Sequence, residues 1–164
     1  MAINQDDLRS AARRSGRQVV TAKRANQRAA FLCHSHLDRE LAEGLQTALR
    51  EQGFDLYIDW QDLTMPATPN AETAAKLRNR IVTCDWFLFL ATANSMASRW
   101  CPWELGYADG MKPNDKIAIV PTRDLHNTHG NEYLQLYRYI DVASGGGLGM
   151  FGAASSQGVM VSTL

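Results

Sequence analysis

Short apolar runs alternate with longer, half-polar stretches through the middle of this chain, and this alternation limits the fold more than any other feature. The most apolar run, Trp86 to Ala91, is six residues long, which suits a buried strand better than a helix. Four further strands are expected, at residues 29–33, 54–60, 116–120 (stopped by Pro121) and within 133–141. Strands that alternate with helices form right-handed βαβ units, so we predict a parallel sheet with helices on both faces.

The stretches between these runs have helical periodicity. Leu41, Leu45 and Leu49 recur every four residues between residues 38 and 52, and Gly53 follows as a C-terminal cap. Asn70 is a good N-cap for a second helix. In parallel sheets, ligands bind beyond the carboxyl ends of the strands. The loops expected to carry function are residues 34–37, 60–69, 92–99 and 121–132.

Charge and composition divide the chain into three parts. Residues 1–28 hold seven of the 17 Lys and Arg residues but only two of the 17 Asp and Glu residues. We predict a basic, partly helical extension over 1–28, one α/β domain over 29–143, and an irregular glycine-rich segment over 144–164. The basic segment is read as a solvated helix. No aromatic residues are interleaved with its charges, which argues against nucleic acid as a partner.

The cysteine count and the lack of long apolar runs indicate the compartment. Three cysteines, with no C-x-x-C pair, favour reduced, buried thiols, and Cys101 is the one that could instead be a catalytic thiol. No apolar run approaches the roughly 18 residues of a membrane span, and the N-terminus does not resemble a secretory signal. We therefore expect a cytoplasmic protein without a membrane span.

Common cofactor and metal motifs are missing from the sequence. There is no P-loop, no G-x-G-x-x-G after a strand, and no His/Cys pair with zinc-ligand spacing. His34 and His36 are read as hydrogen-bonding loop residues rather than as metal ligands. We expect neither a bound metal nor a resident cofactor.

The stretch from Ser98 to Ala108 is the strongest candidate for chemistry. Pro102 suits the first turn of a helix, and Glu104 then falls within or just after that turn. Trp100 and Trp103 flank this carboxylate at the mouth of the predicted sheet. The same residues also suit a structural role, in which the indoles cover the sheet edge and Glu104 interacts with the helix dipole. The residues alone do not separate these two interpretations.

Several segments, taken in order, resemble the Toll/interleukin-1-receptor (TIR) domains of bacteria. The run from Ala30 to Ser35 and the segment Leu56 to Asp59 are similar to the first two TIR sequence boxes, and the proline-bearing loop that follows resembles the BB loop. Trp100-x-x-x-Glu104 is similar to the W-x-x-x-E motif of TIR proteins that cleave NAD⁺. The resemblance covers roughly residues 29–141. It implies a flavodoxin-like fold with a central parallel five-stranded sheet.

The resemblance also implies a substrate and a set of site residues. NAD⁺ would be a substrate and not a cofactor, with Glu104 as the catalytic carboxylate and Trp100 beside it. Weaker candidates for substrate contacts stand at strand ends that face the same crevice: His34, Ser35, Asp59 and Trp60. Cleavage of the bond from ribose to nicotinamide resembles glycoside hydrolysis, with an oxocarbenium-like transition state. Nicotinamide leaves as a neutral molecule, so one carboxylate is enough.

Three classes of function remain open from the sequence. The first is an NAD⁺-consuming enzyme, hydrolytic or cyclising, for which the resemblance implies anti-phage or effector signalling, TIR–TIR self-association and a separate sensor or activator. The second is a non-catalytic interaction module, in which Glu104 is only a helix-start charge. The third is an enzyme similar to nucleoside deoxyribosyltransferases, which would form a covalent glycosyl-enzyme intermediate.

Overall fold

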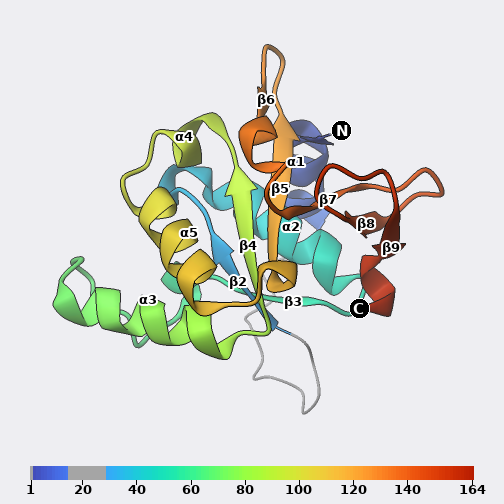
Figure 1. Cartoon of the computed structure of the whole chain (residues 1–164). Helices are drawn as coiled ribbons and strands as arrows, with labels where there is room; N and C mark the ends of the chain where they lie inside the picture. The colour runs from blue at the N-terminus through green and yellow to red at the C-terminus, as the bar shows by residue number, and fades with distance from the viewer. Residues whose placement is uncertain (1, 15–28) are drawn as a thin grey trace.

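Five parallel strands form the centre of the protein. A computed structural model of the chain describes residues 2–14 and 29–164. The central strands lie in the order β3-β2-β4-β5-β7, and each is parallel to its neighbour. Their bounds are β2 (Ala29–Cys33), β3 (Asp55–Tyr57), β4 (Trp86–Ala91), β5 (Ile117–Arg123) and β7 (Arg138–Val142). This is the doubly wound, flavodoxin-like order, and it confirms the predicted sheet (Figure 1).

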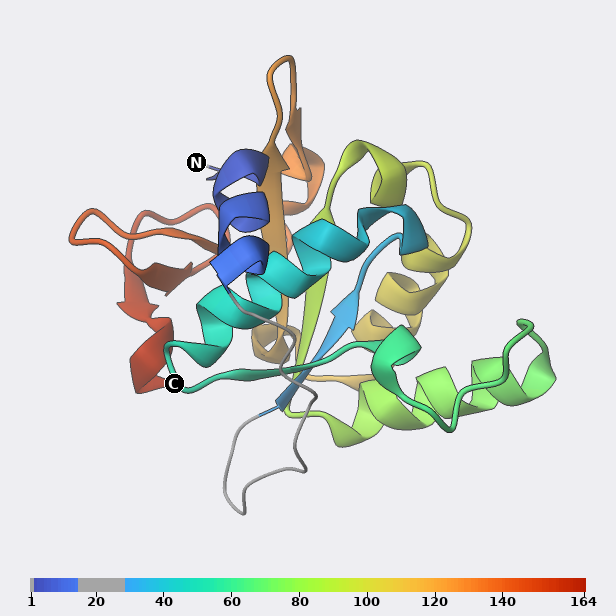
Figure 2. The same ribbon diagram turned by 180° about the vertical axis from the view of Figure 1, so that it is seen from behind.

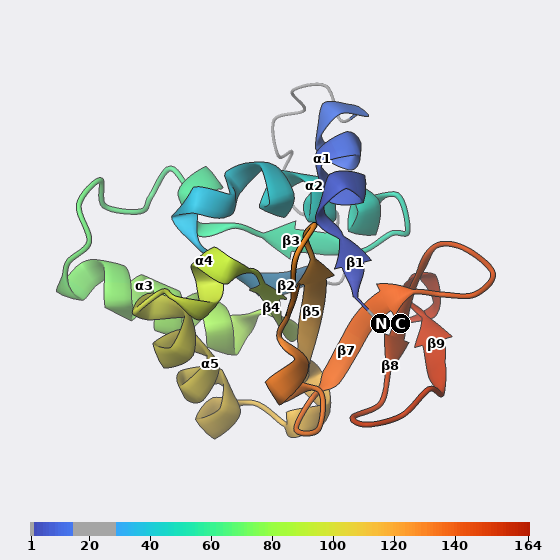
Figure 3. The same cartoon turned by 90° about the horizontal axis from the view of Figure 1, so that it is seen from above.

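Two helices cover each face of the sheet. On one face lie α1 (Gln5–Arg14) and α2 (Arg39–Arg50), which cross each other in Figure 2. On the other lie α3 (Ala71–Thr83) and α5 (Trp100–Met111), while the short α4 (Ala93–Met96) follows β4. The view from above shows these layers on either side of the strands (Figure 3). The predicted start of α3 is confirmed, since Asn70 and Thr73 form a capping box there. The C-cap residue of α2 is Glu51, and the predicted Gly53 follows two residues later at φ 79°.

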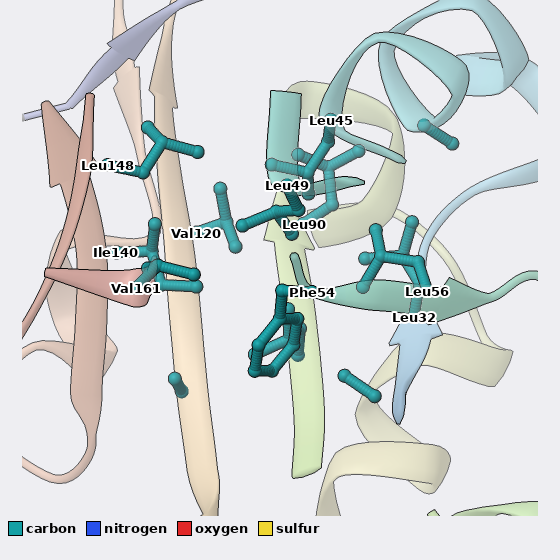
Figure 4. Packing of buried hydrophobic residues seen from close by; sticks show 14 of the residues in the cluster. Leu32, Leu45, Leu49, Phe54, Leu56, Leu90, Val120, Ile140, Leu148 and Val161 are labelled. Atoms are coloured by element: carbon teal, nitrogen blue, oxygen red, sulfur yellow. The ribbon is translucent and has the colours of Figure 1, made fainter. Parts of the chain in front are cut away.

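Alternate residues of each central strand enter one of two separate cores. Leu88 and Leu90 of β4 pack on the side of α1 and α2, whereas Phe87 and Phe89 pack on the side of α3 and α5. Figure 4 shows the first core, where Leu45 and Leu49 of α2 meet leucine and valine side chains of the sheet. The sheet is therefore buried on both faces, which explains why β4 is apolar at every position.

The N-terminal segment belongs to the folded domain. A weak helix without an apolar stripe is expected over residues 6–25, yet α1 buries Leu8 and Ala11, and β1 (Ile3–Asn4) pairs in parallel with the end of β5. A Cβ atom on Gly44 of α2 would lie 1.9 Å from the Leu8 carbonyl oxygen, so the two helix backbones touch there. The rest of the predicted helix, residues 15–25, lies outside the described residues.

The glycine-rich C-terminal segment is ordered, which corrects the expectation of an irregular tail. β8 (Leu148–Phe151) pairs antiparallel with β7, and β9 (Gly158–Met160) pairs antiparallel with β8. Gly146 and Gly147 have φ values of 86° and 74°, so the glycines form the tight turn between β7 and β8. Leu148 and Met150 are buried in the first core, which gives this hairpin its apolar support.

The strand β5 runs past the proline that was expected to stop it. Beyond Pro121, Thr122 and Arg123 pair with β1 on one side and with β6 (Thr128–His129) on the other. These added partners keep the chain extended after a residue that lacks a backbone N–H. No helix within residues 2–14 and 29–164 is long and apolar enough to cross a membrane.

Candidate functional site

The helix α5 begins at the carboxyl edge of the sheet and carries Glu104 one turn into its length. The hydroxyl of Ser98 accepts hydrogen bonds from the backbone N–H groups of Trp100 (3.1 Å) and Cys101 (3.3 Å), and so caps the helix. Pro102 lies in the first turn, where its missing N–H is harmless. The expected helix is thereby confirmed, and Glu104 faces inward with Cys101 and Leu105.

The Glu104 carboxylate is buried beside two thiols and one further acid. Its residue is 7% exposed, although no ion pair with a described residue balances its charge. Burial raises the pKa of Glu104 well above the usual glutamate range, and the charges of Cys101 and Asp59 act in the same direction. A hydrogen bond with the Cys33 thiol at the end of β2 opposes this rise. The result is a carboxyl group that ionises reluctantly when nothing cationic is near.

Trp100 lies at the surface end of the same helix. It is 41% exposed, and it precedes Glu104 by four residues, the spacing of neighbours on one side of a helix. Its ring meets the Trp103 ring edge-on, with centroids 5.4 Å apart, and Trp103 stacks in turn on Tyr107. The exposed indole is thus held in place by aromatic contacts.

His34 and Trp60 are joined to each other. The indole N–H of Trp60 donates to Nε2 of His34 at 3.0 Å, while Nδ1 of His34 lies 3.2 Å from the Leu32 carbonyl oxygen. An indole nitrogen can only donate, so Nε2 is the acceptor and Nδ1 carries the proton. Both ring nitrogens of His34 are therefore engaged within the protein, and its side chain is only 3% exposed.

Ser35 and Asp59 complete the set of residues singled out in the sequence. The Ser35 hydroxyl accepts from the Leu37 backbone N–H at 3.3 Å and caps the short helix η1 (His36–Asp38). Asp59 begins the short helix η2 (Asp59–Gln61) and is 37% exposed at its side chain. One carboxylate oxygen of Asp59 accepts from the Trp60 backbone N–H at 2.8 Å and lies 3.9 Å from His34 Nε2. The structure thus brings His34, Asp59 and Trp60 into contact.

Comparison with known proteins decides the family. The sequence pattern of the TIR domain matches residues 30–149, about three quarters of the chain. The chain belongs to the TIR domain family. It is also 40% identical, over 117 residues, to a protein of Bacillus cereus (strain MSX-D12) named "Probable 3' cyclic ADP-D-ribose synthase ThsB'". That match covers 67% of this chain and 58% of the relative, so the chain spans somewhat more than half of the relative's length.

The TIR domain also contains a buried acid that sequence reasoning missed. Asp38 is 5% exposed, and its two carboxylate oxygens accept from the Thr92 hydroxyl (2.5 Å) and the Asn94 side-chain amide (2.6 Å). Asp38 occupies the N-cap position of α2 but makes no side-chain cap there, because its carboxylate crosses to the loop after β4. It joins the segment after β2 to the segment after β4, two of the regions expected at the carboxyl edge. The prediction that these regions meet was the signal in the sequence that could have pointed to Asp38.

The proline-bearing loop of the TIR domain is anchored at its start by a second acid. Asp62 accepts hydrogen bonds from the Tyr57 hydroxyl (2.7 Å) and from the backbone and hydroxyl of Thr64 (3.0 and 2.6 Å), and pairs with Arg80 (3.1 Å). Burial opposes the ionisation of Asp62, but the hydrogen bonds from Thr64 and Tyr57 and the charge of Arg80 prevail and lower its pKa to about 2. Leu63, the next residue, is 99% exposed.

Two of the three cysteines of the TIR domain, Cys33 and Cys101, lie beside Glu104. Cys33 is fully buried, with its thiol 3.7 Å from the Cys101 carbonyl oxygen, and Cys101 is 1% exposed. A hydrogen bond from Cys33 lowers the pKa of Cys101, while burial acts the other way. With so little exposure, Cys101 is poorly placed to attack a substrate carbon. Within the described residues, no three His, Cys, Asp or Glu side chains cluster as metal ligands do.

Proposed function

We propose that this TIR domain cleaves NAD⁺ between ribose and nicotinamide, with Glu104 as the catalytic carboxylate. The observation that carries the proposal is a buried acid without a balancing cation at the carboxyl edge of a parallel sheet, with an exposed indole at the mouth on the same helix. The name of the Bacillus cereus relative, a probable cyclic ADP-ribose synthase, supports the same chemistry.

The geometry suits a reaction that needs one carboxylate. As the bond from C1′ to the pyridinium nitrogen breaks, its electron pair leaves with nicotinamide, which becomes neutral without a general acid. Positive charge then develops on C1′ and the ring oxygen of the ribose. A carboxylate in a site of low dielectric stabilises this charge more strongly than water does. Trp100 offers an aromatic face on which the cationic nicotinamide ring can stack before it leaves.

The raised pKa of Glu104 links catalysis to the arrival of the substrate. An opposite charge nearby favours the ionised form of an acid, so the pyridinium of NAD⁺ lowers the pKa of Glu104 when it binds. Before the substrate binds, burial disfavours the ionised form of Glu104, which is the form that the proposed reaction needs. The apparent kcat/KM therefore rises with pH, and its acidic limb lies above the ordinary glutamate pKa of about 4.3.

The cation formed at C1′ is captured by a nucleophile that then releases one proton. If water attacks, the products are nicotinamide and ADP-ribose; if a nucleophilic atom of the same ADP-ribose attacks, a cyclic ADP-ribose forms. The name of the relative favours ring closure. ADP-ribose, formed by hydrolysis, is the second candidate product of the same site.

The proposal includes an assembled, cytoplasmic signalling state. Leu63 projects from an anchored loop and offers an apolar contact to a second TIR domain. Self-association of this kind, triggered by a separate sensor, fits the anti-phage or effector role implied by the family. Arg9 and Arg13 of α1 form ion pairs with Glu40 within the domain, so their charges carry no argument for nucleic acid as a partner.

The deciding experiment measures NAD⁺ loss and products by chromatography at high protein concentration. Glu104→Gln keeps the shape of the side chain and removes its charge, so we expect at least a 100-fold fall in nicotinamide release. Glu72→Gln is the matched control, because Glu72 is an exposed glutamate on α3 and its loss should change the rate less than twofold.

The opposite result identifies an interaction module. If wild-type protein that is demonstrably assembled leaves NAD⁺ intact, the catalytic proposal is wrong and the domain acts as an adaptor. A covalent ribosyl adduct on Glu104, detected by mass spectrometry during turnover, would instead favour the third class named above.

A further inference from the structure

Arg39 stands out among the charged residues near the site because its guanidinium group rests on an aromatic ring and has no acidic partner in the described part of the chain. It lies over the Trp60 ring, 5.0 Å from the centroid. Trp60 is fixed in turn by its hydrogen bond to His34, whose ring is almost completely buried. Arg39 forms no ion pair with any carboxylate in residues 2–14 and 29–164, so its N–H donors are not used by an acidic side chain.

The position of Arg39 places it next to the proposed reaction centre. It is the first residue of α2, directly after the loop that follows β2. Asp59, which neighbours Trp60 in sequence, is close enough to Glu104 for its charge to raise the pKa of that carboxyl. Asp59 and Trp60 therefore link the Glu104 carboxyl, which the Asp59 charge reaches, to the Arg39 guanidinium on the Trp60 ring.

This order of charges matches the order of charges in a nicotinamide dinucleotide. The pyridinium and the cationic C1′ need an anionic environment, while the phosphate on C5′ of the same ribose needs a cation. A guanidinium group donates two parallel hydrogen bonds to a phosphate, and a stacked arginine loses less freedom when it binds. Arg99 precedes α5 at the same edge, but its guanidinium lies over no aromatic ring and pairs with no carboxylate among residues 2–14 and 29–164.

We propose that Arg39, held on the Trp60 ring, binds the diphosphate of NAD⁺ and makes the site selective for dinucleotides over nicotinamide riboside. This inference rests on the proposed function and adds a substrate-binding residue to it. His34 and Trp60 then serve the site indirectly, since they hold the guanidinium in place.

The structure supplies a matched control. Arg78 on α3 also lies over an indole, that of Trp103, at 5.6 Å, and it too forms no ion pair within the described residues. Trp103 is in contact with Trp100 and packs against the second core. Arg39→Ala and Arg78→Ala therefore remove the same kind of contact at two places, one on Trp60 and one on the side where nicotinamide is proposed to stack.

Steady-state kinetics with two substrates test the proposal. We expect Arg39→Ala to raise KM for NAD⁺ about tenfold with kcat within twofold, and to leave KM for nicotinamide riboside, which has no phosphate, unchanged. Arg39→Lys keeps the charge but not the planar fork, so its KM for NAD⁺ should rise about threefold. Any effect of Arg78→Ala should be the same for both substrates, because both carry the nicotinamide ring. Equal effects of Arg39→Ala on both substrates would overturn the proposal.

Binding of ADP-ribose separates this proposal from the catalytic one. Calorimetry with Glu104→Gln protein and ADP-ribose needs no turnover, and adding Arg39→Ala should weaken binding about tenfold while adding Arg78→Ala should not. If that holds and wild type never cleaves NAD⁺, the catalytic proposal fails and the diphosphate site stands. If ADP-ribose does not bind, or binds equally well without Arg39, the diphosphate site is wrong whatever the rate of cleavage.

Discussion

Two acids are buried at the carboxyl edge of the sheet to almost the same degree, and their surroundings are opposite. Asp38 is 5% exposed and has a strong donor for each carboxylate oxygen, from Thr92 and from Asn94. Glu104 is 7% exposed and has the weak thiol of Cys33, with the negative charge of Asp59 nearby. Burial alone thus does not distinguish the acid that holds two loops together from the acid proposed to be catalytic.

This difference suits Asp38 and Glu104 to different roles at the carboxyl edge. Asp38 is satisfied in its ionised form, so it holds two loops together and has no unmet need for a ligand. Glu104 is under-satisfied when ionised, so a cationic ligand gains more from it than from Asp38. A cationic substrate is therefore expected to bind beside the acid whose negative charge the protein does not balance.

The largest expected effect comes from removing each acid and measuring stability. Asp38→Ala removes the carboxylate that accepts from the buried Thr92 hydroxyl and from the Asn94 amide, so we expect a loss of about 2 kcal/mol in urea denaturation. Glu104→Gln should cause no loss, and a gain of up to about 1 kcal/mol at pH 7, because the raised pKa means that folding disfavours the ionised acid. This gain should vanish below pH 4, where both folded and unfolded states are protonated. A large loss from Glu104→Gln would contradict the contrast.

A smaller effect should appear when the thiol beside Glu104 is changed. The Cys33 hydrogen bond favours the ionised form, so Cys33→Ala should raise the pKa of Glu104 further and move the acidic limb of the pH–rate profile upward. At pH 6 the rate should fall about threefold, with little change at pH 8.5. Cys33→Ser keeps a donor and should keep the wild-type profile. A loss that is equal at all pH values would indicate a packing defect instead.

The smallest effect concerns the acid that anchors the proline-bearing loop. The pKa of Asp62 is lowered from 3.8 to about 2, so its contribution to stability is complete above about pH 4 and is lost as the pH falls toward 2. We expect wild type to be more stable than Asp62→Asn by about 0.5 kcal/mol at pH 6, because solvent screening weakens this contribution. Denaturation at pH 6, 4 and 3 should show this difference shrinking. The difference for Glu104→Gln also shrinks as the pH falls, but it has the opposite sign, since there the variant is the more stable protein.

Much of the fold could be predicted from local patterns because the elements concerned are stabilised locally. The run at residues 86–91 is apolar throughout and is buried on both faces, so its strand is evident from the sequence. Asn70 caps α3 through a residue only three positions away. Glu104 was found through the resemblance to the W-x-x-x-E motif, while Pro102 placed it near the start of a helix.

The parts that were missed depend on contacts between distant residues. Asp38 binds Thr92 and Asn94, which are 54 and 56 positions away in the sequence, and the residues adjacent to Asp38 in the sequence do not predict that contact. The sequence of β8 resembles a flexible tail because glycines surround Leu148 and Met150 and mask the apolar pattern of the strand, although both side chains are buried in the first core. In the same way, α1 has too few apolar residues to predict a core helix and needs α2 to complete its packing.

The contact between α1 and α2 has a consequence for reading related sequences. At position 44 there is room for a hydrogen atom and nothing larger, since the Leu8 carbonyl occupies the place of a methyl group. A glycine here lowers the intrinsic stability of α2 by about 1 kcal/mol relative to alanine, a cost that is recovered only when a second helix lies against it. In a related sequence, a glycine at this point of α2 therefore indicates that an amino-terminal helix packs against α2, although the residue it contacts lies thirty-six positions earlier in the chain.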